Sequence, residues 1–280
     1  MSELPTRRRE RIARFVQEVG AARTEDLAER FEVSAMTIHR DLDALQDEGW
    51  LERTRGGARS AGLRLHERNV ILRTRQQVAQ KRALARATMQ FLEPGTTLAL
   101  DDSTTTLALL PHLPLLAPLT LITNFLPVIR YATGEADIDL VGLGGQYDKS
   151  LDSFDGPAVS DQLQLLSADA VVMSVASIHK QWLLHPSAET ARRKRAFIDS
   201  GVTRILLVDS TKFAHRASHR LGEIDLFDVV IVDDAVSEEH LDFLYTRDVR
   251  VEIATVTTED IANDTELAQP LREMTTKGEK

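Results

Sequence analysis

The stretch "VSAMTIHRDL", residues 33–42, carries the signals of a short amphipathic helix. Ser34 is a residue type that caps helices, because its side-chain oxygen accepts a hydrogen bond from a backbone N–H of the first turn. Ile38 and Leu42, with Leu45 just beyond, recur at intervals of four and three residues. That spacing predicts a helix that buries one apolar face and exposes the other.

The exposed face of this helix carries polar side chains suited to DNA. Arg40 lies opposite the apolar stripe, with Thr37 and His39 beside it. An arginine can bond a guanine edge twice or pair with a phosphate, and a helix N-terminus with hydroxyl groups suits phosphate oxygens. We therefore predict that Ser34, Thr37, His39 and Arg40 contact DNA, with the front turns of the helix in the major groove.

Two helices are expected before this one. The first has apolar residues at i, i+3, i+4 and i+7, namely Ile12, Phe15, Val16 and Val19. Gly20 is expected to end it, because glycine commonly follows the last turn of a helix. Thr24 is expected to cap a short second helix. The three helices together are typical of a helix-turn-helix domain.

A basic hairpin is expected after the third helix. The segment "WLERTRGGAR", residues 50–59, predicts two strands joined by a turn at Gly56 and Gly57. Arg53, Arg55 and Arg59 project from it. Three helices and a hairpin make a winged helix-turn-helix over residues 1–60, and we predict that Arg53 and Arg55 contact DNA.

Winged helices also serve as protein–protein modules, and most surface arginines are simply solvated. Three basic elements nevertheless fall in this short domain: Arg7–Arg9, the third helix and the wing. A domain that docks on another protein does not need several basic elements together, whereas a domain that binds the polyanion DNA does. The DNA-binding interpretation is therefore preferred.

The net charge of the whole chain is negative, which is unusual for a DNA-binding protein. The chain has 34 lysine and arginine residues against 43 aspartate and glutamate residues, a formal charge of -9. The charge is unevenly distributed: residues 1–60 sum to -1, residues 61–92 to +6, and residues 93–280 to -14. Charges in water are screened over about 8–10 Å at physiological salt. A distant acidic domain therefore leaves a basic DNA-contacting surface largely unaffected.

The basic segment 61–92 is expected to form a helical connector, either one long helix or two pieces. From residue 79 it has an apolar side, while its other sides carry arginine and lysine. Two interpretations stay open. The segment is a solvated interdomain helix, or its front half either adds phosphate contacts or packs against the acidic domain.

The pattern of apolar residues changes after residue 92. Six short apolar runs alternate with segments of helical spacing; they are 96–101, 119–123, 138–143, 169–175, 204–209 and 228–234. This alternation predicts an α/β domain with a mostly parallel sheet over residues 93–262. Residues 263–280 are expected to form a polar tail.

Polar or glycine residues follow several of these predicted strands. They are Asp101, Ser103, Thr104 and Thr105 after the first, Asn124 after the second, Gly144 and Gly145 after the third, and Lys212 near the fifth. Ligands of parallel sheets bind at the carboxyl ends of strands, and a hydroxyl-rich turn that opens a helix suits an anion. Serine and threonine at such positions are more commonly simple helix caps, and a lone lysine commonly faces solvent.

Both halves of the chain contain motifs of one known family. The segments "VSAMTIHRDL" and "RTRGGA", and then "LDDSTTT", "TN", "GG", "GP", the glutamate of "ETARRK" (Glu189) and "DSTKF", resemble those of the DeoR family of bacterial sugar-metabolism regulators. The resemblance implies an α/β sensor similar to ribose-5-phosphate isomerase. It implies that a phosphorylated sugar binds Asp101, Ser103, Thr104, Thr105, Asn124, Gly144, Gly145, Glu189 and Lys212.

The sequence departs from the family pattern near this predicted site. Asp102 and Ser103 stand where small neutral residues are usual, and Phe125 where serine is usual. Ala176 removes a carboxylate that isomerase chemistry would use as a general base. The alternative function, a sugar-phosphate isomerase with an appended DNA-binding head, is therefore less favoured. A general DNA-architectural protein is disfavoured by the acidic domain.

The sequence thus predicts a transcriptional regulator, most simply a repressor, that is not an enzyme. The expected partners are double-stranded operator DNA, a small-molecule effector and a second or further copies of the chain in a homodimer or homotetramer. We predict neither a cofactor nor a metal site. The chain has no cysteine, no run of about 18 apolar residues and no secretory signal pattern, so we expect a cytoplasmic protein without membrane contact.

Overall fold

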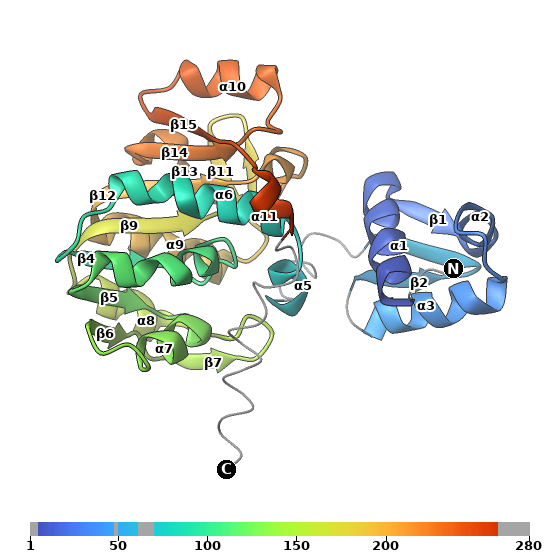
Figure 1. Ribbon diagram of the computed structural model, residues 1–280, viewed down its shortest axis with the longest axis horizontal. Coiled ribbons are helices and arrows are strands. Elements are labelled where there is room, and N and C mark those ends of the chain that lie inside the picture. The colour runs from blue at the N-terminus through green and yellow to red at the C-terminus, as the bar shows by residue number, and fades with distance from the viewer. Residues whose placement is uncertain (1–4, 48–49, 61–69, 263–280) are drawn as a thin grey trace, which may run out of the picture. The chain divides into compact units, whose positions relative to one another are not determined.

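The computed structural model describes residues 5–47, 50–60 and 70–262 (Figure 1). The chain divides into two compact units, Met1–Arg73 and Thr74–Lys280, and each is described by itself. The predicted polar tail and the predicted end of the third helix at Gly49 lie outside the described residues, as does the first part of the predicted connector.

The first unit contains the three predicted helices, α1 (Pro5–Val19), α2 (Thr24–Arg30) and α3 (Ala35–Asp47). Their shared core is built from side chains with no exposed surface, including Ile12, Val16, Leu27, Ile38 and Leu42. The periodicity of the third helix is therefore confirmed.

Two local predictions for this unit are wrong. Val19 is 51% exposed, because it lies in the last turn of α1, beyond the part that packs on the core. Thr24 does not cap α2: the capping position is Arg23, which has an extended backbone, and Thr24 is already the first helical residue.

A three-stranded sheet completes the winged helix-turn-helix. It has the order β1-β3-β2, from β1 (Ala21–Arg23), β3 (Gly57–Ser60) and β2 (Leu51–Thr54), and both pairings are antiparallel. The predicted hairpin is confirmed; β1 was not predicted. Glycine is required at both turn positions: Gly56 has a φ of +88°, and a Cβ on Gly57 would lie 2.2 Å from the carbonyl oxygen of Ala22.

The described part of the predicted connector forms two helices, α5 (Val70–Thr74) and α6 (Val78–Thr88). They are separated by residues that include Gln77, which has a left-handed backbone with a φ of +50°. α6 belongs to the second unit. There it packs against the 3-10 helix η2 (Thr106–Leu116), the strands β14 (Val229–Asp233) and β15 (Arg250–Ala254), and the helix α11 (Thr258–Ala262).

The second unit is built on a seven-stranded sheet in which every described pairing is parallel. Its order is β15-β14-β12-β9-β4-β5-β6. The strands are β4 (Thr97–Leu100), β5 (Leu119–Thr123), β6 (Ile138–Gly142), β9 (Ala168–Ser174), β12 (Gly201–Val208), β14 (Val229–Asp233) and β15 (Arg250–Ala254). All six predicted strands are confirmed, and β15 is an addition.

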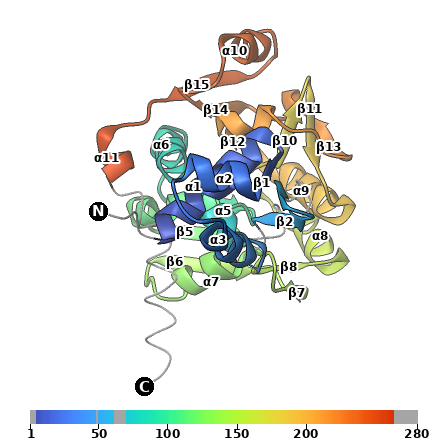
Figure 2. The ribbon, with the colours of Figure 1, turned by 90° about the vertical axis from the view of Figure 1, so that its right-hand side faces the viewer.

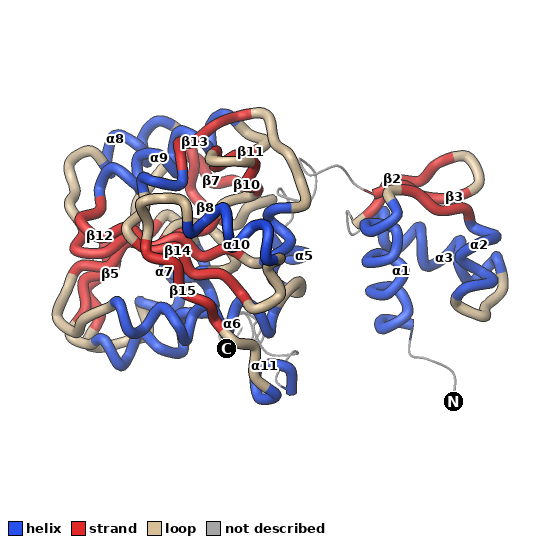
Figure 3. The backbone as a smooth tube through the Cα atoms, turned by 90° about the horizontal axis from the view of Figure 1, so that it is seen from above, coloured by secondary structure: helices blue, strands red, loops and turns tan. Residues whose placement is uncertain are grey.

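Helices cover both faces of this sheet, as parallel sheets require. α8 (Pro157–Leu163) and α9 (Ala188–Ser200) lie on one face and α6 on the other (Figures 2 and 3). The central strands are accordingly rich in valine, isoleucine and leucine, and every residue of β14 is buried. The mostly parallel α/β architecture predicted from the sequence is confirmed.

The segment after β4 is predicted as a helix and forms the 3-10 helix η2. Pro111 and Pro114 lie inside it, and because proline has no backbone N–H, it interrupts α-helical hydrogen bonding. The other helical segments are α7 (Leu126–Ala132), α10 (Glu238–Tyr245), α11 (Thr258–Ala262), η1 (Met89–Phe91), η3 (Ser210–Phe213) and η4 (Ile224–Leu226).

Two small antiparallel sheets flank the main sheet. One is the hairpin of β7 (Gln146–Asp148) and β8 (Ser153–Asp155). The other contains β10 (Ser177–His179), β11 (Trp182–His185) and β13 (His219–Glu223). In the part of the chain that the structure describes, no helix is long and apolar enough to span a membrane.

Candidate functional site

Helix α3, for which we predict the DNA contacts and which we call the reading helix, is preceded by Ser34, its predicted cap. The Ser34 hydroxyl oxygen accepts the backbone N–H of Thr37 at 3.2 Å, and the two hydroxyl groups lie 2.9 Å apart. Arg40 is exposed and, among the described residues, has no side-chain partner. The geometry therefore leaves the Arg40 guanidinium available to another molecule.

His39 of α3 is held by the wing. Arg53 Nη2 lies 2.7 Å from Nδ1 of His39, and Arg53 Nε lies 3.4 Å from the carboxylate of Asp43. Arginine can only donate a hydrogen bond, so His39 Nδ1 is the acceptor and the proton of the neutral ring resides on Nε2. The backbone N–H of Arg53 also donates to the side chain of Gln46 at 2.9 Å. Arg53 thus ties the wing to the reading helix.

Arg59, Arg8 and Arg9 are each paired with a carboxylate of the same unit. Arg59 donates to Glu52 at 2.7 Å across the hairpin. Arg8 and Arg9 both pair with the buried carboxylate of Asp41 on α3, at 2.6 and 3.2 Å. These two arginines of α1 therefore fasten α1 to α3.

The wing turn itself carries an exposed arginine. Arg55 lies in the turn between β2 and β3, is exposed, and has no side-chain partner among the described residues. Of the three wing arginines, it is the one whose charge no carboxylate of the described structure offsets.

In the second unit, the turn after β4 forms the centre of a polar cluster. Residues 101–106 are all at most 5% exposed. Asp101 Oδ1 accepts the backbone N–H of Ser103 at 3.1 Å, and the Ser103 hydroxyl oxygen accepts the backbone N–H of Thr106 at 3.2 Å. Ser103 therefore satisfies the first backbone N–H of η2, while the capping position itself, Thr105, makes no side-chain bond to the helix.

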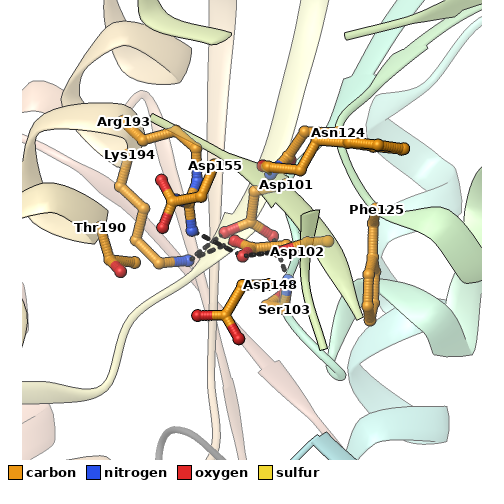
Figure 4. Close-up of polar contacts among 12 residues, drawn as sticks. Asp101, Asp102, Ser103, Asn124, Phe125, Asp148, Asp155, Thr190, Arg193 and Lys194 are labelled. Atoms are coloured by element: carbon orange, nitrogen blue, oxygen red, sulfur yellow. Dashed lines mark hydrogen bonds and ion pairs between the residues drawn. The ribbon is translucent and has the colours of Figure 1, made fainter. Parts of the chain in front are cut away.

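Two cations from α9 neutralise the carboxylates of this turn (Figure 4). Lys194 Nζ lies 2.5 Å from Asp101 Oδ2, and Arg193 Nη2 lies 2.6 Å from Asp102 Oδ2. Arg193 also pairs with Asp155 of β8. Burial alone would lower the pKa of Arg193, but Asp102 and Asp155 outweigh burial and raise this pKa. We call these five residues the buried ion cluster.

A third cation reaches the turn from α6. Lys81 is 4% exposed, and its ammonium group donates to the Thr104 hydroxyl at 3.0 Å. This residue was not predicted as part of the site. A signal exists in the sequence, because Val78, Lys81, Ala85 and Thr88 follow helical spacing, and a lysine on a buried stripe needs a polar partner.

Several buried polar atoms in this region have no hydrogen-bond partner within the described structure. They are Asn124 Oδ1, Ser174 Oγ and Arg193 Nε. Asn124 follows β5, Ser174 ends β9, and the amide nitrogen of Asn124 donates to the carbonyl of Phe154 at 2.8 Å. Buried polar groups normally find partners, so these atoms mark a place where hydroxyl groups of a bound molecule could bond.

The structure brings Asp101, Ser103, Thr104, Thr105 and Asn124 together at the carboxyl ends of β4 and β5. The remaining predicted effector residues lie at other strand ends or on α9. Lys212, in η3, is half-buried and follows the carboxyl end of β12.

Gly144 is bonded on both sides by Gln162 of α8: its N–H donates to Oε1 at 3.2 Å and its carbonyl accepts from Nε2 at 2.8 Å. Gly145 has no room for a side chain, because a Cβ would lie 2.5 Å from the carbonyl oxygen of Asp155. Gly145 therefore lets the chain pass close to β8, whereas a Cβ on Gly144 would meet nothing within 4 Å.

Glu189 is exposed in the first turn of α9. It lines a groove of about 550 Å³ between α8 and α9, together with Gly156 and Arg192. No residue of the turn 101–106 lines that groove.

One further ion pair joins the two ends of the second unit. Arg86 of α6 donates to Asp260 of α11 at 2.6 Å and to the carbonyl of Thr255 at 2.9 Å. Burial would raise the pKa of Asp260, but hydrogen bonds from Arg86 and Thr257 outweigh burial and lower this pKa. In the described residues, no group of three or more histidine, aspartate or glutamate side chains is placed to hold a metal ion.

A winged helix-turn-helix with an exposed reading helix, carried on one chain with a parallel α/β domain that has a polar cluster at its strand ends, defines a transcriptional regulator with a sensor domain. Residues 8–62 match the DeoR-like helix-turn-helix domain, and residues 76–234 match the DeoR C terminal sensor domain. The chain belongs to the DeoR family.

Related proteins match this chain over most of its length. The uncharacterized HTH-type transcriptional regulator YgbI of Escherichia coli is 30% identical, over 90% of this chain and 98% of its own. The lactose phosphotransferase system repressor of Lactococcus lactis is 30% identical, over 84% and 94%. The glycerol-3-phosphate regulon repressor of Escherichia coli is 29% identical, over 81% and 90%.

Among solved structures, ribose 5-phosphate isomerase A from Methanocaldococcus jannaschii aligns with 48% of this chain and 53% of its own, with 13% identity and a TM-score of 0.35. A score this low carries no argument about function.

Proposed function

We propose that the protein represses a carbohydrate-metabolism operon and is released from its operator by a phosphorylated sugar or a related metabolite. Two relatives of this chain are by name a lactose phosphotransferase system repressor and a glycerol-3-phosphate regulon repressor. A relative named as an L-fucose operon activator shares 28% identity, so activation is the alternative outcome at some promoters.

On the DNA side, Arg40 reads bases and Arg55 contacts phosphates. Both side chains are exposed and have no partner within the described residues. Ser34 accepts a backbone N–H of the first turn of α3. Arg53 acts by holding His39 in place. Ser34, Thr37 and His39 complete the contact surface at the front of α3.

On the sensor side, the observation that carries the proposal is the buried ammonium group of Lys81 beside the hydroxyl-rich turn 103–105. A cation and hydroxyl groups at the start of a helix, at the carboxyl end of a parallel strand, suit a phosphate group. Asn124 and Ser174 supply neutral partners for sugar hydroxyls. Glu189, Gly144, Gly145 and Lys212 form the outer part of the proposed site.

The protein acts as a homodimer or homotetramer, because paired DNA half-sites need paired helices to contact them. It acts in the cytoplasm. It performs no turnover: residue 176, where isomerase chemistry would need a carboxylate, is an alanine.

A thermal-shift screen with sugar phosphates, polyol phosphates and their unphosphorylated counterparts tests the proposal. A ligand that binds only the folded protein raises its stability by RT ln(1 + [L]/Kd). We expect a phosphorylated compound to raise the midpoint and to weaken operator binding at the same concentrations. Lys81→Met should remove both effects. Consumption of the ligand by the purified protein would instead support the isomerase alternative.

A further inference from the structure

The buried ion cluster contains more carboxylates than a phosphate-binding site requires. Asp101 and Asp102 come from the turn after β4, and Asp155 comes from the β7–β8 hairpin. Arg193 and Lys194 face them from α9, as Figure 4 shows. The buried ion cluster therefore holds three carboxylates against two cations, so negative charge is in excess among its own residues. Lys81 lies outside the cluster, beside Thr104.

Asp102 is the carboxylate of the turn that pairs with Arg193. Its Oδ2 accepts from Arg193 Nη2 at 2.6 Å and from the Ser153 hydroxyl at 3.0 Å. Arg193 is 1% exposed and also pairs with Asp155, whose side chain is 14% exposed. Both carboxylate partners of this guanidinium are thus supplied by the protein itself.

A buried cluster that already has more carboxylates than cations disfavours a further negative charge. A buried ion is stable only when an opposite charge and hydrogen bonds compensate for its lost hydration. Arg193 offers no uncompensated charge to an incoming anion, and Asp102 would repel one. The atoms left unpartnered, Arg193 Nε, Ser174 Oγ and Asn124 Oδ1, are suited instead to neutral hydroxyl groups.

We propose that Asp102 determines the specificity of the sensor by neutralising Arg193 and so excluding a second anionic group. Building on the proposed function, the effector is a metabolite with one phosphate, bound near Lys81, whose remaining groups are hydroxyls. Sugar bisphosphates and phosphorylated sugar acids are rejected, because their second anion would face the buried ion cluster.

Isothermal titration of the full-length protein with sulfate, at constant ionic strength, tests the exclusion directly. Asp102→Asn keeps the shape of the side chain and removes its charge, so Arg193 is left with one carboxylate. We expect this variant to bind sulfate on the order of tenfold more tightly than the wild type, or better. Asp199→Asn is the matched control, since it frees the exposed Arg195 on the same helix from its carboxylate partner. We expect it to behave as the wild type does.

Equal sulfate affinity in wild type and a folded Asp102→Asn variant overturns the proposal, and so does an equal gain in Asp199→Asn. If Asp102→Asn does not fold, Asp155→Asn removes the other carboxylate from the same guanidinium and must give the sulfate gain.

The proposed function is tested separately, by measuring the binding of a panel of sugar phosphates to the wild-type protein. A sulfate gain in Asp102→Asn, with no panel member bound by the wild type, supports exclusion and counts against the proposed function. Wild-type binding of a bisphosphate or phosphorylated acid more tightly than its hydroxyl counterpart overturns the specificity claim itself.

Discussion

The different roles proposed for Arg55 and Arg53 of the wing can be tested without knowledge of the operator sequence. Arg55 is exposed without a partner in the described structure, whereas Arg53 is bonded to His39 and lies 3.4 Å from Asp43. Each phosphate that a protein neutralises adds about 0.9 to the slope of log K against log salt. Removing one phosphate contact should therefore flatten this slope by about 0.9.

The slope converts into a measurable ratio. Between 50 and 200 mM salt, a slope change of about 0.9 alters the ratio of wild-type to variant affinity by about 3.5-fold. We expect this change for Arg55→Ala on random duplex DNA. For Arg53→Ala we expect a much smaller slope change, because Asp43 already offsets part of its charge. Its effect should fall on the preference between sequences, since His39 loses its support.

The assay is fluorescence anisotropy of a labelled random duplex, titrated with full-length protein at several salt concentrations. Arg59→Ala provides the control, because this arginine is also in the wing but pairs with Glu52. Equal slope changes for Arg53→Ala and Arg55→Ala would refute the reasoning and return Arg53 to the role of a phosphate contact.

Three further outcomes are expected. Arg40→Ala should cost about 1–3 kcal/mol of discrimination between operator and random DNA, and an unchanged preference in a folded variant would remove Arg40 from base reading. Lys212→Ala should keep operator affinity and weaken the response to the effector; the same half-maximal effector concentration as in wild type would exclude Lys212 from the site. The depressed pKa of Asp260 adds stability at pH values above the pKa of an unfolded carboxyl group, and this stability is lost as the pH falls through the lower folded pKa. Thermal midpoints of wild type and Asp260→Asn should accordingly differ at neutral pH and converge as the pH falls below the usual carboxyl range; a constant difference would show that the charge of Asp260 does not contribute.

Much of the first unit could be predicted because its signals are local. Ser34 directly precedes α3, Ile38 and Leu42 lie within it, and the turn at Gly56 joins two adjacent strands. What was missed has no local pattern. β1 is only three residues long, and it moved the start of α2 by giving Arg23 an extended backbone.

The parallel sheet could also be predicted, since its buried strands are continuous apolar runs separated by helices. The predicted turn at the end of β4 lies at the centre of the polar cluster, because carboxyl ends of parallel strands share one edge. The charges around that turn could not be predicted. Arg193 and Lys194 lie more than ninety residues from Asp102 and Asp101 in sequence, and no spacing rule joins helix and turn across that distance.

The basic composition of the connector left two interpretations open: a solvated interdomain helix, or a segment that contacts phosphates or packs against the acidic domain. For α6 the structure shows packing, because Lys81 is buried against Thr104 and Arg86 pairs with Asp260. Composition alone could not decide between these interpretations, because it does not say which basic side chains have partners in the acidic domain.

Operator binding and effector binding are, by this proposal, coupled in one chain. The most direct test measures effector affinity of the full-length protein with and without a saturating operator fragment selected by the protein from a random DNA library. The operator should weaken the effector by the same factor by which the effector weakens the operator, because linkage between two binding sites is reciprocal. Effector affinity that is identical with and without operator DNA would contradict the account.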